Sequence, residues 1–69
     1  MKVIDLLNKM IDEEVVKIVP EEKLISECNC NKAGSIFVEK YYNYTVHSIE
    51  AFYSSIEGSY IMIECYKRG

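Results

Sequence analysis

The chain is only 69 residues long, and this length limits it to a single domain, residues 1–69. A chain of this size buries only about 60% of the surface that it exposes when unfolded, so its core is marginal. Hydrophobic residues make up 49% of the sequence and charged residues 28%, which is ordinary for a globular protein and too apolar for a disordered one. We therefore expect one folded domain with a small core, of the kind that disulfides, a metal or a partner chain often stabilise.

The formal net charge is −3, from eight Lys and Arg against eleven Asp and Glu. Proteins that bind nucleic acid usually carry a basic surplus that neutralises phosphates, and neither half of this chain has one. This argues against direct binding to nucleic acid or to an anionic membrane. No stretch approaches the roughly 18 apolar residues of a membrane span. The odd number of cysteines is unlike a secreted disulfide scaffold, so we expect reduced thiols in a cytoplasmic protein.

Apolar residues near the amino terminus recur at the spacing of an α-helix. They are Val3, Leu6, Leu7, Met10 and Ile11, at positions i, i+3, i+4, i+7 and i+8. Charged and polar residues take the other side. The pattern predicts a helix over about residues 2–13 whose apolar stripe contributes to the core.

Three segments have the β-branched and aromatic composition of strands, at about residues 15–19, 35–42 and 59–66. In the last of them, alternation puts Ile61, Ile63 and Cys65 on one face, which we expect in the core. Residues 24–28 fit a strand or a helical turn that begins near Pro20 equally well.

The segment 45–57 is ambiguous between helix and strand. As a helix it would have one apolar face, formed by Val46, Ile49, Phe52, Tyr53 and Ile56. As a strand it would send these side chains to both faces, although its residues favour β structure. We favour the helix because it accounts for all five apolar residues. The predicted fold class is α+β, with the N-terminal helix packed on an antiparallel sheet of three or four strands and a second helix at about 45–57.

No residue pattern points to an enzyme. Cys28, Cys30, His47 and Cys65 are potential zinc ligands, but the Cys-x-Cys spacing is tighter than the usual one and the other two residues lack local spacing. His47 is the only histidine, and no neighbouring residue is evident as its catalytic partner. The three glycines are widely separated and form no phosphate-binding loop. We predict no catalytic residue, no metal and no cofactor.

Six tyrosines are unusually many for a chain of this length. Tyr41, Tyr42 and Tyr44 fall within four positions, and strand alternation would send them to both faces of a sheet. Tyrosine is enriched at protein interfaces because it buries apolar area and keeps a polar tip. We predict that these three residues belong to the main binding surface, in self-association or with a foreign protein; the alternative is that the rings cap the core.

Acidic residues bracket the strand predicted at 15–19. Asp12, Glu13 and Glu14 precede it and Glu21 and Glu22 follow it. Such a cluster can attract the basic groove of a nucleic-acid-binding protein, or it can be a solvated face. We predict that Asp12, Glu13 and Glu14 contribute to partner binding.

The opening sequence, from Met1 to Met10, resembles that of many short proteins of phages and mobile elements of low-GC Gram-positive bacteria. Beyond Ile11 the chain departs from the Gly-Glu-Val-Pro continuation of that group. The resemblance implies a phage or prophage origin, where inhibitors of host defence such as anti-CRISPR proteins are common. We therefore expect a non-enzymatic protein-binding module in a bacterial cytoplasm that occupies a surface of a host or viral protein, such as a nucleic-acid-binding one, and most readily inhibits a host protein. The alternatives are a homo-oligomeric structural or regulatory module, such as a homodimer, and a nucleic-acid-binding domain.

Overall fold

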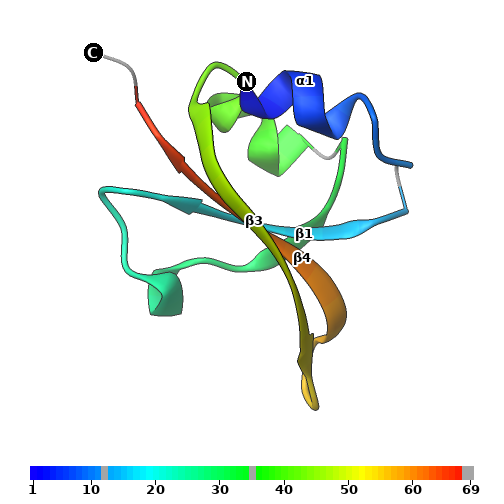
Figure 1. The fold of residues 1–69 in the computed structure, drawn as a ribbon. Helices are drawn as coiled ribbons and strands as arrows, with labels where there is room; N and C mark the ends of the chain where they lie inside the picture. Colours follow the sequence, from blue (N-terminus) through cyan, green and yellow to red (C-terminus); the bar gives the residue numbers. More distant parts are fainter. Residues whose placement is uncertain (12, 35, 68–69) are drawn as a thin grey trace.

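A four-stranded mixed sheet forms the centre of the fold, with short helices beside it (Figure 1). The computed structural model describes residues 1–11, 13–34 and 36–67. The elements in chain order are α1 (Val3–Leu7), β1 (Val15–Pro20), the 3-10 helix η1 (Ile25–Glu27), β2 (Cys30–Lys32), the 3-10 helix η2 (Ile36–Tyr41), β3 (Thr45–Ser54) and β4 (Gly58–Tyr66). The α+β class and the strands predicted at 15–19 and 59–66 are confirmed. None of the described helices is long and apolar enough to cross a membrane.

The strand order is β2-β1-β4-β3. The outer pairs β1–β2 and β3–β4 are antiparallel, but the central pair β1–β4 is parallel. The predicted all-antiparallel sheet is therefore wrong at its centre. The chain leaves β1, passes through β2, η2 and β3, and returns as β4 in the same direction as β1. Buried residues dominate β1, as is typical of a strand with neighbours on both sides.

Residues 45–54 form strand β3, so the favoured helix at 45–57 is wrong. The strand pairs with β4 through nine register positions, with an irregularity between Val46 and Ser48. His47 is the extra residue of this bulge, and the bulge changes which residues share a face. Val46 therefore lies opposite Cys65, and Ile49 lies opposite Ile63, both on the core side. Val46 and Ile49 are three residues apart and share a face, as residues at this spacing do on a helix. The bulge produces the same arrangement on a strand.

The N-terminal helix is shorter than predicted, ending at Leu7 instead of about residue 13. Lys9 and Met10 donate their N–H groups to carbonyls three residues back, which closes the last turn tightly. Acidic residues such as Glu13 would also oppose the negative end of a longer helix dipole. Of the predicted core residues, Leu7 is buried, Leu6 and Met10 are half-buried, and Ile11 is 64% exposed.

Residues 36–41 form η2 and not the predicted strand. The chain after η2 bonds to α1: the Tyr44 and Tyr42 carbonyls accept the N–H groups of Val3 and Ile4, at 2.9 and 3.0 Å. These amides begin α1 and have no partner inside the helix. At 24–28, the structure has the helical turn η1, one of the two alternatives left open.

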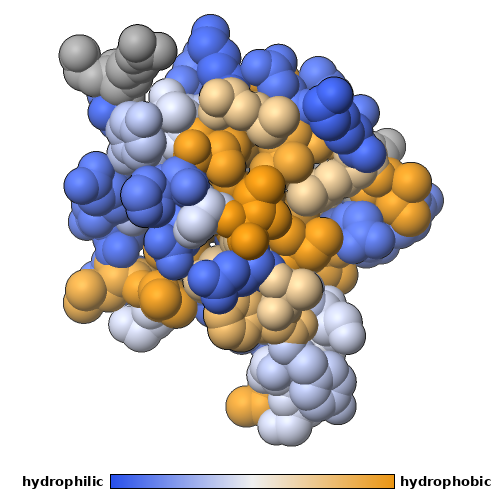
Figure 2. All heavy atoms as spheres, in the orientation of Figure 1, coloured by the Kyte–Doolittle hydropathy of each residue, from blue (hydrophilic) through white to orange (hydrophobic). Residues whose placement is uncertain are grey.

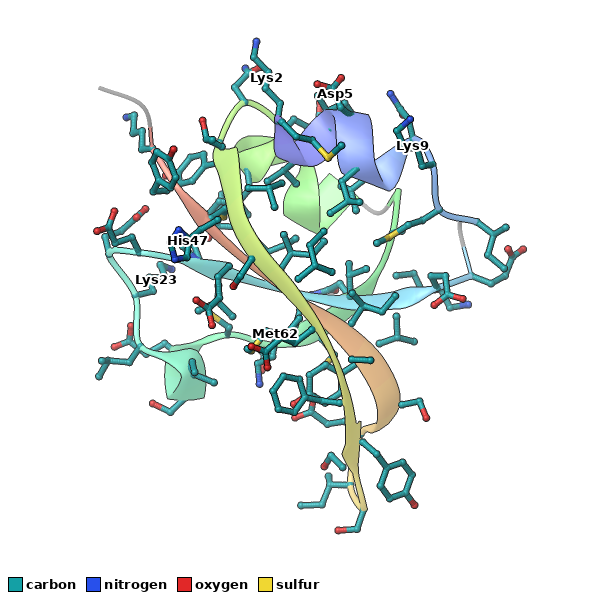
Figure 3. The ribbon with its side chains drawn as sticks, viewed as in Figure 1. Lys2, Asp5, Lys9, Lys23, His47 and Met62 are labelled. Atoms are coloured by element: carbon teal, nitrogen blue, oxygen red, sulfur yellow. The ribbon has the colours of Figure 1, made fainter. Side chains whose placement is uncertain are left out.

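The hydrophobic core lies on one face of the sheet. Strands β1 and β4 supply Val16, Ile18, Ile63 and Cys65 to it. The other members of this cluster are Val3, Leu7, Ala33 and Tyr41. Helices α1 and η2 lie on the same side of the sheet in Figure 1. In Figure 3, Lys2, Asp5 and Lys9 point away from the sheet, so the charged side of α1 faces outward.

Candidate binding surface

Strand β3 is an edge strand, and most of its outer side has no partner strand. Val46 donates its N–H to the Met1 carbonyl at 2.8 Å, and Lys2 forms an isolated bridge with Thr45. From His47 to Ser54, the outer side pairs with no strand in the described part of the chain. Figure 1 looks onto this edge, with β3 crossing in front of β4 and β1.

The register shows which backbone groups of β3 point outward. The N–H of Val46 faces outward, and in an antiparallel pair the direction alternates from residue to residue. The bulge at His47 shifts this alternation by one position. Ile49, Ala51 and Tyr53 therefore turn their N–H and C=O groups away from β4. These groups are available to a strand that adds to the edge.

Apolar side chains surround this edge. The four large ones are Ile49, Phe52, Tyr53 and Ile56, which are 47%, 40%, 77% and 93% exposed. The Phe52 ring stacks on Tyr60 with a centroid distance of 5.8 Å. Figure 2 shows apolar surface gathered where β3 crosses the molecule. We call Ile49, Ala51, Phe52, Tyr53 and Ile56 the hairpin surface.

A polar contact fixes the tip of this hairpin to the rest of the sheet. Glu57, in the β3–β4 turn, accepts a hydrogen bond from the Cys30 thiol of β2. Its other oxygen lies 4.0 Å from the Nζ of Lys17, which is only 7% exposed and lies 5.7 Å from the centroid of the Tyr60 ring. Lys17 thus has an opposite charge and an aromatic face as partners in a mostly dry environment. The hairpin is held in place where it leaves the sheet.

The predicted tyrosines lie at the core. Tyr41 is 5% exposed, and its ring meets that of Tyr44 edge-on at 5.2 Å and the Nζ of Lys40 at 5.0 Å. Tyr42 and Tyr44 are half-buried and pack against the core cluster. The structure brings the three residues together but leaves little of Tyr41 for a partner. Their role in partner binding stays a prediction.

Tyr44 is also tied to the loop that follows β1. Its hydroxyl donates to Oε1 of Glu22 at 2.8 Å. The pKa of Glu22 lies below its ordinary value, first because the carboxylate accepts a backbone N–H and then because it accepts the Tyr44 hydroxyl. The same hydrogen bond raises the pKa of Tyr44. This contact is structural and leaves Glu22 ionised at neutral pH.

The acidic residues do not form one cluster. Glu13 is exposed and Glu14 is half-buried before β1, whereas Glu21 and Glu22 follow it. A six-residue strand separates the two groups by about 20 Å. Asp12 lies outside the described residues. Glu13 and Glu14 lie before the start of β1, and the role of Asp12, Glu13 and Glu14 in partner binding stays a prediction.

The three cysteines are free, and burial keeps their thiols protonated. Burial raises the pKa of Cys65 to about 12, and burial followed by the hydrogen bond to Glu57 raises that of Cys30 to about 11. The pKa of Cys28 is also raised by burial. A protonated thiol is a weak nucleophile. Within residues 1–11, 13–34 and 36–67, no group of three or more His, Cys, Asp and Glu side chains could hold a metal ion.

His47 lies at the rim of a surface hollow of about 380 Å³, together with Lys23, Glu64 and Tyr66. It is exposed, and its ring meets that of Tyr66 edge-on at 6.4 Å. Figure 3 shows His47 and Lys23 on the same side of the molecule. A general base needs an orienting hydrogen bond, and none is described for His47 in these parts of the chain. Polar and apolar side chains both line the hollow, and no catalytic group is assembled among its described residues.

Sequence reasoning placed the hairpin residues on the buried face of a helix and so missed them as a binding surface. The β propensity of residues 45–54 and the glycine at 58, whose φ is +78°, were the signals for a hairpin. Comparison of the chain with protein-family models, curated proteins and solved structures found no match.

Proposed function

We propose that this chain is a non-enzymatic protein-binding module that acts by occupying a surface of another protein. The observation that supports this best is the free outer edge of β3, bordered by exposed apolar side chains. Such edges accept an added strand through backbone hydrogen bonds, while the neighbouring side chains select the partner.

The chemistry of the hairpin surface suits a protein partner. Phe52 and Tyr53 offer large aromatic area with few rotatable bonds, and aromatic anchors supply much of the energy of protein interfaces. Burying apolar surface contributes about 25 cal/mol for each Å² removed from water. The contact of Glu57 with Lys17 and Cys30 limits the motion of the hairpin, so less entropy is lost on binding.

We further propose that the partner is a host protein and that binding inhibits it, as an anti-defence or anti-CRISPR protein would. This step rests on the phage-like opening sequence. The net charge of −3 favours a partner with a basic surface, such as a nucleic-acid-binding enzyme. In this proposal, Glu13 and Glu14 steer the encounter, and the exposed parts of Tyr42 and Tyr44 add contacts.

The test compares three forms of the tagged protein in a bacterial lysate. In the first variant, Tyr53→Lys and Ile56→Lys place two charges on the hairpin surface. In the matched control, Asn8→Lys and Ser26→Lys add the same charge at two exposed positions. Asn8 caps the C-terminal end of α1, and Ser26 lies in η1. We expect the parent and the control to capture the same specific protein and the hairpin variant to lose at least 10-fold, because charges oppose desolvation of an apolar interface.

Each captured protein is then purified and its activity is titrated with the three forms. Inhibition by the parent and the control alone would support the whole proposal. Equal capture by all three forms would place the binding surface elsewhere, and the absence of any specific capture would contradict the binding function.

A further inference from the structure

We infer that a second copy of this chain pairs with the first along the free edge of β3, which forms a two-fold symmetric dimer with one continuous eight-stranded sheet. This interface goes beyond the proposed function, since it needs no foreign partner. It uses the same backbone edge of β3, so a second copy and a foreign strand compete for that edge, while the faces of the hairpins stay open to a partner.

The two edges of the sheet differ in how they are protected. Natural edge strands avoid pairing by being short, or by carrying lysine or proline. At one edge, β2 has only three residues and ends in Lys32. At the other edge, the free part of β3 from His47 to Ser54 contains no lysine, arginine or proline. Its one bulge lies at the end of this stretch, beside Val46, and the register is regular from Ser48 to Ser54.

The symmetry of a self-paired strand restricts the register. When a strand pairs with its own antiparallel copy, opposite residues lie on the same face of the sheet. Residues on one face are an even number of positions apart, so the midpoint between two opposite positions is a residue. The two-fold axis therefore passes through a residue position. An axis at Glu50 would bring two carboxylates face to face, which is unfavourable. An axis at Ala51 places two small side chains at the crossing point. The register at Ala51 also uses the whole free stretch from Ser48 to Ser54.

Pairing about Ala51 is self-complementary. Ile49 of each copy lies opposite Tyr53 of the other, a β-branched and aromatic pair of the kind that stabilises sheets. Glu50 lies opposite Phe52 and not opposite another charge. The backbone groups of Ile49, Ala51 and Tyr53 already point outward, and this register pairs them with one another. Three such pairs exchange about six hydrogen bonds.

Apolar residues also lie at the two ends of the paired stretch. Ile56 lies in the β3–β4 turn at one end, and Met1 is bonded to Val46 at the other. Ile56 and Met1 are 93% and 61% exposed in the single chain. Because the two copies of β3 run antiparallel, the turn of one copy comes beside the Met1 end of the other. A foreign strand would meet the backbone edge equally well but would not have this fixed set of matching side chains.

The test measures molecular mass by light scattering over a concentration series for the parent, Ala51→Lys, Ala51→Glu and an equimolar mixture of these two variants. We expect the parent to reach twice the 8.0 kDa of the chain. Each variant alone should remain at the mass of one chain, because two like charges face each other at the axis. The mixture should regain the doubled mass, because opposite charges then meet there. Ser26→Lys is the matched control and should behave like the parent.

Circular dichroism and thermal melting show that each variant is folded. A parent that stays at the mass of one chain at every concentration would overturn the self-pairing. A parent dimer that persists in both single variants, or a mixture that stays monomeric, would overturn the register at Ala51. No foreign protein is present in this mass measurement, so it tests self-pairing alone. The capture experiment tests the proposed function separately.

Discussion

Replacing Ile63 with alanine should remove about 2–5 kcal/mol from the free energy of unfolding. Ile63 is fully buried, in the middle of the central strand β4, and belongs to the core cluster with Val16 and Ile18. A domain of this size has a total stability of only about 3–10 kcal/mol. The loss is therefore a large fraction of the total stability, and urea denaturation followed by circular dichroism measures it.

Ile49→Ala is the matched control for this substitution. Ile49 lies directly opposite Ile63 on β3 and on the same face of the sheet, but it is 47% exposed. The same chemical change should cost less than half as much there, because little cavity is created and less apolar area is returned to water. Equal losses at the two positions would show that the outer strand is covered in the isolated chain or that the register is different.

The second large effect is expected for Tyr41→Ala, which should cost about 3–5 kcal/mol, as for other large aromatic core residues. Tyr41 is buried and contacts the ring of Tyr44, and the chain that follows it is bonded to α1 through Tyr42 and Tyr44 carbonyls. The measurement is the shift of the urea midpoint at unchanged protein concentration.

Tyr53→Ala provides the comparison, since Tyr53 is 77% exposed on the hairpin surface. Its free energy of unfolding should stay within about 0.5–1 kcal/mol of the parent while partner or self-association weakens. If Tyr41→Ala instead kept the free energy of unfolding of the parent and lost binding, the tyrosine segment would be the principal interface.

Local patterns predicted the central strands well. The runs at 15–19 and 59–66 are rich in β-branched residues, and both form central strands of the sheet, with nearly all of β1 and three residues of β4 buried. Their parallel pairing was not predictable, because it depends on the path of the 37 intervening residues and not on the strands themselves. The apolar spacing predicted the start of the N-terminal helix but not its end. The spacing continues through Met10 and Ile11, whereas the helix ends at Leu7.

The candidate site was harder to predict because one inserted residue changes the pattern. His47 places Val46 and Ile49 on the same face, which a regular strand cannot do, and the spacing then matched a helix. The tyrosine segment at 41–44 was interpreted as a strand with rings on both faces, whereas η2 turns Tyr41 into the core. Composition alone does not distinguish a core tyrosine from an interface tyrosine.

Residue-resolved amide hydrogen exchange across β3 tests most directly whether the outer edge of this strand is the binding edge. In dilute protein, the amides of Glu50 and Phe52 should be protected because they bond to β4, while those of Ile49, Ala51 and Tyr53 should exchange quickly. The second set should become protected as concentration rises and the copies pair. The account would be contradicted by uniform protection through residues 45–57 in dilute protein, or by rapid exchange of Ile49, Ala51 and Tyr53 at every concentration and with a captured partner bound.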